Sequence, residues 1–397
     1  MRSARLGPSR CNRNAKFQAI MLIVMKRRTF LQTVPASLAA TAPGAAEIPK
    51  RRGVPSQITD IKIHEPAGLL RIITNAGLEG WCLDVSEDTA RLIQAQYRSA
   101  LIGRDPLLRE RIWQELVRLD RLQPRIPPVR AYLDVALWDL GGKALGLPVY
   151  QLIGGFRGRI PACRTGNPLP TVEAVVGDAL AVRSEGFLGY KQRGYADVKE
   201  TARLAKAVRR AVGPDFYLMH DGGQQFDHDG ALRVGKALQE QAYYWLEEPL
   251  QNADILGLKQ LAGTLDIPIV AAVTNPDGLH AASQLLALQA ADIVQAGVPL
   301  LGGITDALKL ARLAEAFLVH CEFKQSDWTG GFVLAHLLGA FKNCAFYETS
   351  RAGSQGGGPL IKNPLMLDKG HLPVPGSPGL GIELDWQQVE KQTTHVI

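Results

Sequence analysis

The stretch YYWLEEPL, Tyr243 to Leu250, combines two features that seldom occur in one buried strand. Its aromatic and aliphatic residues predict a strand in a protein interior, yet they run directly into two adjacent carboxylates, Glu247 and Glu248, and then Pro249. Burying a charge without a partner is costly. The stretch therefore predicts either that the two carboxylates meet solvent where the strand ends, or that a cation binds one of them.

The same succession of a short apolar strand and a helix recurs from Arg159 onward. With a first strand at RIPACRTG, residues 159–166, it gives eight strand–helix units, which favours a closed (β/α)8 TIM barrel. A doubly wound open sheet is the structural alternative, but no glycine-rich dinucleotide-binding turn follows any expected strand. In a barrel, the carboxyl ends of the strands surround the active site. The expected ends of the later strands are Lys191, Asp221, Glu247, Val273, Gly297, Lys324 and Glu348.

The part of the chain before the barrel has a different order of elements. Short strands are expected between Ile58 and Leu83, and helical periodicity follows up to Pro148, which predicts an α+β domain. The predicted boundaries are an export signal at 1–46, a linker at 47–56, the α+β domain at 57–158, the barrel at 159–350 and a C-terminal segment at 351–397.

The net charge of +7 comes from the N-terminal leader rather than from the body of the chain. The first 46 residues hold eight Lys or Arg and no acid, so the remainder has 37 basic and 38 acidic residues. Because the body has no bias toward polyanions, no nucleic-acid partner is expected. The segment KRRTFLQ, Lys26 to Gln32, resembles a twin-arginine motif and is followed by small residues up to Ala46, which predicts export to the periplasm.

Membrane insertion and disulfide scaffolding are not indicated by the sequence. No apolar run is long enough to span a bilayer, so no stable membrane span is expected. The cysteines after the leader show neither C-x-x-C spacing nor a paired pattern, so we expect isolated buried thiols. These cysteines are Cys82, Cys163, Cys321 and Cys344.

Three segments together resemble the mandelate racemase and muconate lactonizing enzyme branch of the enolase superfamily. They are ALWDLGGKALGLPVYQLIGG (Ala136–Gly155), LEEP (Leu246–Pro249) and LPVPGSPGLGIELD (Leu372–Asp385), and the resemblance extends over about residues 58–386. It implies that the α+β domain caps the barrel and that the C-terminal segment packs back to complete this cap. It also implies that three carboxylates from the third, fourth and fifth barrel strands hold Mg2+, which stabilises the enediolate formed when a base removes the α-proton of a carboxylate substrate.

The resemblance implies roles for residues at several strand ends. Asp221 and Glu247 match the first two metal ligands, and Glu348 matches the acid that hydrogen-bonds the substrate carboxylate. Lys191 matches the first lysine of the family's K-x-K motif, whereas Arg193 stands where the proton-abstracting lysine usually is. A guanidinium stays charged and can clamp a carboxylate with two hydrogen bonds, so we expect Arg193 to bind substrate rather than to act as a base.

The base is therefore expected to be Lys191 or Lys324. A lysine base needs a depressed pKa, which a nearby cation helps to provide. Glu248, the neighbour of Glu247, is expected to point away from the metal into supporting hydrogen bonds or a salt bridge.

The fifth strand departs from the family pattern. The third carboxylate position falls on Val273, which offers no ligand atom. Nearby oxygen donors are Thr274, Asn275 and Asp277, although a shift of one residue along a strand reverses the side-chain direction. Two carboxylates with waters can still hold Mg2+, but more weakly than three.

The sixth and seventh strands depart as well. Gly297 stands where racemase-like members carry the Asp of an Asp–His dyad. The matching His position falls on Lys324 or on Trp328, depending on the side from which it is counted, and His320 comes too early. The hairpin IHEPAGLLRI, residues 63–72, is also short, which predicts a short lid over the mouth of the barrel.

Two functions follow from these residues. The first is an exported enzyme that abstracts the α-proton of a small carboxylate, either a sugar acid or another hydroxy acid, as a dehydratase, epimerase or racemase. The alternative is a catalytically impaired relative that binds an anionic ligand or a partner, because Val273 and Gly297 remove two carboxylates. A third option keeps catalysis but moves the metal onto Asn275 or Asp277. Many relatives form dimers or octamers, so the resemblance also implies a homo-oligomer.

Overall fold

The computed structural model describes residues 57–122, 124, 126–273, 278–324, 328–350 and 358–397. The predicted export signal (1–46), the linker (47–56) and the three oxygen donors Thr274, Asn275 and Asp277 lie outside the described residues. No helix in the described part of the chain is long and apolar enough to cross a bilayer.

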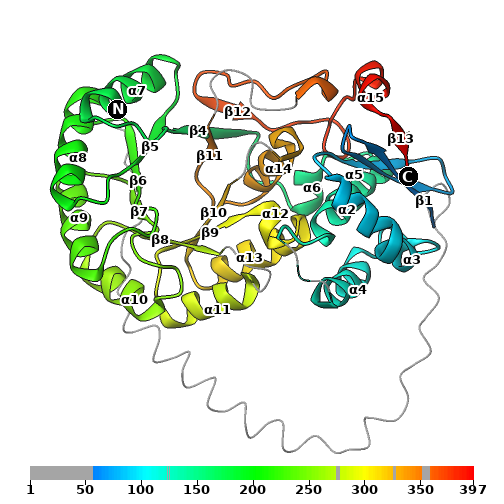
Figure 1. Cartoon of the computed structure of the whole chain (residues 1–397), viewed down its shortest axis with the longest axis horizontal. Coiled ribbons are helices and arrows are strands. Elements are labelled where there is room, and N and C mark those ends of the chain that lie inside the picture. The colour runs from blue at the N-terminus through cyan, green and yellow to red at the C-terminus, as the bar shows by residue number, and fades with distance from the viewer. Residues whose placement is uncertain (1–56, 123, 125, 274–277, 325–327, 351–357) are drawn as a thin grey trace, which may run out of the picture. The chain divides into compact units, whose positions relative to one another are not determined.

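Eight parallel strands form the predicted barrel (Figure 1), and a short antiparallel strand, β12 (His371–Pro373), pairs with the first of them. The parallel strands neighbour one another in chain order, β4 to β10, with the last, β11, paired back onto β4. A doubly wound sheet would reverse its strand order, so that alternative is excluded. The strands are β4 (Arg159–Thr165), β5 (Gly189–Arg193), β6 (Tyr217–Asp221), β7 (Trp245–Glu247), β8 (Ile269–Val273), β9 (Ile293–Gly297), β10 (His320–Lys324) and β11 (Tyr347–Thr349).

Helices follow the strands and cover the outside of the barrel (Figure 1). Several begin at a Thr or Asp whose side chain accepts a hydrogen bond from the backbone N–H three residues later, as in Thr171, Asp197, Asp227 and Asp254. Such caps satisfy an N–H group that the helix itself leaves unpaired. The helices are α7 (Val172–Ser184), α8 (Val198–Val212), α9 (His228–Glu240), α10 (Ile255–Thr264), α11 (Gly278–Leu288), α12 (Val298–Leu301), α13 (Ile304–Ala316), η3 (Trp328–Gly331) and α14 (Phe332–Ala340).

The N-terminal α+β part contains a four-stranded antiparallel sheet with the order β13-β1-β2-β3. The edge strand β13 (His395–Val396) comes from the C-terminal segment and pairs with β1 (Ile58–Glu65). The C-terminal segment therefore contacts both parts of the protein, since its strand β12 pairs with barrel strand β4. The remaining elements are β2 (Leu69–Thr74), β3 (Glu79–Cys82), α2 (Glu87–Leu92), η2 (Ile93–Tyr97), α3 (Arg98–Leu101), α4 (Arg109–Leu122), α5 (Arg130–Leu145), α6 (Val149–Ile153), η4 (Gly358–Leu360) and α15 (Trp386–Gln392).

A buried arginine joins the N-terminal part to the barrel. The guanidinium of Arg130, at the start of α5, donates to Asp120 on α4 at 2.7 Å and to Asp306 on α13 at 3.0 Å. Its remaining nitrogen donates to the carbonyl oxygen of Leu301 on α12 at 2.9 Å. Each of its three hydrogen-bonding nitrogens is thus paired, which is the condition for burying a charged side chain without a large cost.

The barrel closes differently between β10 and β11, and we call this place the seam. Among the described residues, no ladder pairing joins these two strands. Instead, the backbone N–H of Cys321 donates to the carbonyl of Asn343 at 2.9 Å, and the carboxyl of Glu322 accepts from the N–H groups of Ala345 (2.6 Å) and Phe346 (3.4 Å). At the seam, the Glu322 carboxyl therefore accepts the backbone N–H hydrogen bonds that carbonyl groups of a neighbouring strand accept elsewhere in the sheet. Burial raises the pKa of Glu322 to about 8, despite these backbone N–H groups.

We predict that Glu322 makes the stability of the protein fall as pH rises. The folded state keeps a proton on Glu322 up to about pH 8, whereas the unfolded chain releases it near pH 4.3. The free energy of unfolding should therefore decrease between these values by at most about 1.4 kcal/mol per pH unit from this group and then level off. Glu322→Gln should lack this contribution to the pH dependence of the free energy of unfolding. When both proteins are unfolded in urea, the stability of the variant relative to wild type should therefore rise between pH 5 and 8. A constant difference between the two proteins over that range would contradict the assignment.

Candidate metal and acid-base centre

The candidate site residues lie two positions beyond the side chains that fill the inside of the barrel. These inner side chains form a separate hydrophobic cluster of Cys163, Met219, Trp245, Val270, Ile293 and Phe346. Because side chains alternate along a strand, the residue two positions later lies on the same face. Those later residues are Thr165, Asp221, Glu247, Ala272, Gln295 and Glu348. The strand ends thus place a polar layer above an apolar one.

Lys191 on β5 lies between two of the predicted acids. Its Nζ is 3.0 Å from each carboxylate oxygen of Glu247 and 2.7 Å from Oε1 of Glu348. Thr165 donates to the same oxygen of Glu348 at 2.7 Å. Lys191 is 2% exposed and Glu247 is fully buried, so this ion pair is shielded from water.

These contacts shift the pKa values of all three charged groups. Burial alone would lower the pKa of Lys191, but Glu247, Glu348 and Asp221 raise it above its ordinary value. Burial alone would raise the pKa of Glu348, but the ammonium of Lys191 brings it below the usual range. For Glu247, burial outweighs the attraction of Lys191, and the pKa is raised. Glu247 therefore remains short of positive charge, which suits it to bind a cation.

The raised pKa of Lys191 differs from the depressed value expected for a base. The cause is the pair of carboxylates that contact its ammonium. A divalent cation on the neighbouring acids would act in the opposite direction, because its charge repels the ammonium.

Lys324 reaches the same acids from the other side of the barrel mouth. Its Nζ lies 3.6 Å from Glu247 and 3.7 Å from Glu248, and its side chain is 23% exposed. Strands β9 and β8 stand between its own strand, β10, and β7, which carries Glu247. The inward-facing residues of these two strands near the mouth are Ala272 on β8 and Gln295 and Gly297 on β9, so two of the three are small.

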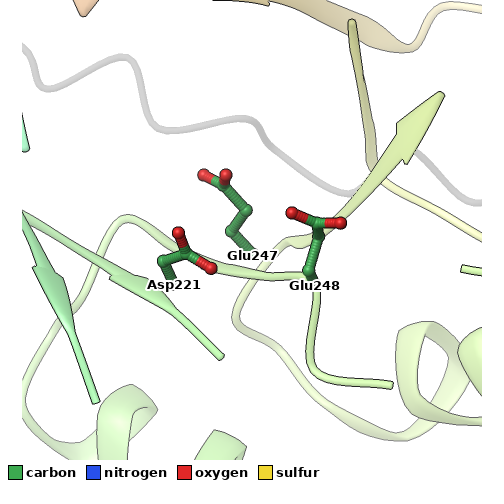
Figure 2. Close-up of side chains that lie close together, drawn as sticks. All are labelled: Asp221, Glu247 and Glu248. Atoms are coloured by element: carbon green, nitrogen blue, oxygen red, sulfur yellow. The ribbon is translucent and has the colours of Figure 1, made fainter. Parts of the chain in front are cut away.

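A cluster of three carboxylates occupies the ends of β6 and β7 (Figure 2). Asp221, Glu247 and Glu248 each offer an oxygen, and these oxygens lie within 4.8 Å of one another. Asp221 also accepts a hydrogen bond from the N–H of Gly223 at 3.0 Å. Hard divalent cations such as Mg2+ prefer oxygen ligands of this kind, so the donor set fits the predicted metal.

The expectation that Glu248 points away from the cluster was wrong. Its carboxylate lies beside those of Asp221 and Glu247, although it also accepts hydrogen bonds from Gln224 (2.8 Å) and Asn252 (2.5 Å). The reason lies in the backbone, because strand β7 ends at Glu247 and Glu248 has a φ of +42°. Strand alternation, on which the expectation rested, no longer applies in this left-handed conformation.

Val273 does not stand at a metal-ligand position. Its side chain belongs to the main hydrophobic core, and a Cβ on Gly278 would meet both Val273 and Leu301, so Val273 faces the helices. Val270, three residues earlier, belongs to the inner cluster instead. The prediction that Val273 occupies the third ligand position was therefore wrong, since the inward direction on β8 falls on Ala272.

Gln295 on β9 is a member of the site that sequence reasoning missed. Its amide nitrogen donates to Glu247 at 3.3 Å, and its amide oxygen is buried with no hydrogen-bond partner among the described residues. An unpaired buried acceptor at this position fits a site that takes up a polar ligand or a hydrated ion. The signal in the sequence was a glutamine inside the apolar strand IVQAG, two residues before Gly297.

Arg193 lies at the exposed rim of the site. Its side chain is 52% exposed, and one guanidinium nitrogen is 4.0 Å from Asp221. Trp328, one of the two positions counted for a dyad histidine, packs edge-to-face on Tyr132 of the N-terminal part at 5.7 Å. His320 is at the start of β10, the end remote from the acids. Lys324 is therefore the residue of this segment that reaches the acidic cluster.

Two family models match the chain. The model of the mandelate racemase / muconate lactonizing enzyme N-terminal domain matches residues 46–154. The model described as enolase C-terminal domain-like matches residues 174–389. Together they cover the N-terminal part, the barrel from α7 onward and much of the C-terminal segment.

Several sugar acid dehydratases are similar to this chain. The L-talarate/galactarate dehydratase of Salmonella typhimurium is 35% identical over 54% of this chain and 55% of its own length. A D-galactonate dehydratase family member of Streptomyces bingchenggensis is 31% identical over 80% of this chain and 87% of its own length. The structure of D-glucarate dehydratase from Agrobacterium tumefaciens complexed with magnesium has a TM-score of 0.73 and 30% identity, covering 86% of this chain and 97% of that chain. The structure of L-talarate dehydratase from Polaromonas sp. JS666 complexed with Mg and L-glucarate has a TM-score of 0.73 and 25% identity, covering 86% and 98%.

We predict that Lys191 is needed for the stability of the protein. Lys191→Met should lower the free energy of unfolding by about 3–5 kcal/mol, because it leaves Glu247 buried without its ammonium partner. Glu247→Gln in the same chain should restore much of this loss, which urea unfolding would measure. Lys199→Met, at an exposed position on α8, is the matched control and should behave as wild type. A Lys191→Met protein as stable as wild type would show that the ion pair does not matter for folding.

Proposed function

The chain belongs to the mandelate racemase/muconate lactonizing enzyme family of the enolase superfamily, and on this premise we propose that it removes the α-proton of a small sugar acid or related hydroxy acid. The observation that carries the proposal is the convergence of Lys191, Asp221, Glu247, Lys324 and Glu348 from five strands on one buried volume. Relatives named as dehydratases of galactarate, galactonate and glucarate support a sugar acid as the substrate.

In this proposal Asp221, Glu247 and Glu248 hold Mg2+. A bound Mg2+ would supply positive charge against the negative charge that develops on the substrate carboxylate. Arg193, at the rim, binds a carboxylate of the substrate with two hydrogen bonds, as its planar guanidinium allows. Glu348 is held by Thr165 and Lys191, and because its pKa is lowered it is placed to accept a hydrogen bond from a hydroxyl of the substrate rather than to donate one to a carboxylate.

The geometry favours Lys324 as the base and Lys191 as a fixed positive charge. Lys191 contacts two carboxylates at 3.0 Å or less, which stabilises its charged form. Among the described residues, the carboxylate nearest to Lys324 is 3.6 Å away, and the Lys324 side chain is partly exposed, so it is placed to approach a bound substrate. The two lysines approach from β5 and β10, on either side of β7. This arrangement places the proposed base on one side of the acids and the fixed positive charge on the other.

A second candidate is an anion-binding protein without catalytic activity. Two observations favour it. Lys191 and Arg193 are positively charged side chains beside the acids. Position 297 is a glycine, so it provides no carboxylate that could orient a histidine base. Such a protein would bind a sugar acid without exchanging its α-proton.

We predict that the protein exchanges the α-proton of at least one of galactarate, glucarate, talarate and galactonate in D2O with Mg2+, as measured by NMR. Lys324→Met should slow this exchange by about 100-fold or more, because a positioned base typically contributes 10²–10⁴-fold. Lys342→Met, which removes a lysine exposed on the surface, is the control and should exchange as wild type. Folded protein that binds one of these acids without exchanging it would support the anion-binding candidate instead.

We predict that Mg2+ binding depends on all three acids of the cluster. Calorimetry should show binding weakened roughly tenfold or more by Glu247→Gln, and weakened also by Glu248→Gln, because each loses one charged ligand. Glu240→Gln, at the exposed end of α9, should leave the affinity unchanged. Equal Mg2+ affinity in Glu248→Gln and wild type would limit the metal site to Asp221 and Glu247.

A further inference from the structure

Two cysteines face each other across the seam of the barrel. Cys321 lies on β10, and Cys344 lies three residues before β11. The backbone N–H of Cys321 donates to the carbonyl of Asn343, the hydrogen bond that sets residues 321 and 344 side by side in a parallel pairing. Burial raises the pKa of the Cys344 thiol, and the neighbouring Cys321 raises it further.

The spacing of the two residues suits a covalent bond. Neighbouring strands lie about 4.8 Å apart, and a disulfide joins Cα atoms about 4.4–6.8 Å apart. Both cysteines are buried in the main hydrophobic core, at 0% and 2% exposure, and both are reduced in the structure. All four described cysteines are buried free thiols, as predicted, but Cys321 and Cys344 are neighbours across the seam. Cys82, by contrast, contacts the hydroxyl of Thr329 and not another thiol.

We propose that Cys321 and Cys344 form a disulfide that closes the barrel between β10 and β11. In the reaction with a small disulfide such as oxidised glutathione, one cysteine thiolate attacks a glutathione sulfur and releases one reduced glutathione. The second thiolate then attacks the mixed disulfide and releases the other. Two protein thiols are oxidised and one glutathione disulfide is reduced to two thiols, so electrons and protons balance. Because both thiols are buried, the reaction proceeds during folding or when the seam opens.

The cross-link would act on the candidate site through the two strands that it joins. Strand β10 carries Lys324, three residues beyond Cys321, and β11 carries Glu348, four residues beyond Cys344. Ladder hydrogen bonds join the other neighbouring strands of the barrel, whereas between β10 and β11 the described residues show the backbone bond of Cys321 and the contacts of Glu322. A covalent bond would therefore add a fixed link between the two strands that carry Lys324 and Glu348.

The experiment uses the purified full chain in a glutathione buffer with a high oxidised fraction. One sample is unfolded and refolded in this buffer, and a second sample is kept native in it. Free thiols are then blocked with iodoacetamide, and tryptic peptides are analysed by mass spectrometry without reduction. We expect a linked pair of peptides containing Cys321 and Cys344, 2 Da lighter than their sum, and an increase in Tm of about 5 °C that a reductant reverses.

The matched variants are Cys344→Ala, which should lose both the linked peptides and the increase in Tm, and Cys163→Ala, which should keep both. Recovery of Cys321 and Cys344 as alkylated thiols in both oxidised samples would overturn the proposal. So would linkage of either residue to a different cysteine. Because the wild-type chain alone gives this answer, the result does not depend on whether a variant folds, nor on whether the protein is an enzyme.

Discussion

The ammonium of Lys191, held between the carboxylates of Glu247 and Glu348, sets the condition on which the rest of the barrel mouth depends. Parallel strands that end at one edge direct their last side chains into a small volume, and like charges in that volume repel each other strongly. Positive charge must therefore share the space. Lys191 supplies it from β5 and Lys324 from β10, and the raised pKa of Glu247 shows that the balance still favours a further cation.

Small residues are as important to this arrangement as charged ones. Ala272 and Gly297 stand on the inward face of β8 and β9, the two strands between Lys324 and Glu247. Gly297 stands where the resemblance predicts the acid of a dyad, and Lys324 of the next strand lies 3.6 Å from Glu247.

The fold could be predicted from the sequence because strand–helix repetition and hydrophobic spacing are local properties. The predicted strand ends Asp221, Glu247, Val273, Gly297 and Lys324 are the last residues of their strands. The site was harder to predict from the sequence. The direction of a side chain reverses when the strand register shifts by one residue, and it also depends on the local backbone conformation. Glu248 turns back because its φ is positive, and Val273 faces outward because the alternation on β8 is shifted by one residue. Glu322 and Gln295 looked like ordinary polar residues, because what makes them distinctive is a partner on a distant strand.

The pairing of β13 with β1 has a consequence for the order in which the protein is made. Ribosomes synthesise the N-terminal sheet first, yet one edge of that sheet waits for a strand from the opposite end of the described chain. Until then β1 presents unpaired backbone groups that any other extended peptide could occupy. The barrel, by contrast, is built from neighbours in sequence and can assemble as it emerges. We therefore expect nascent chains that stall before β13 to be recognised by chaperones mainly through β1.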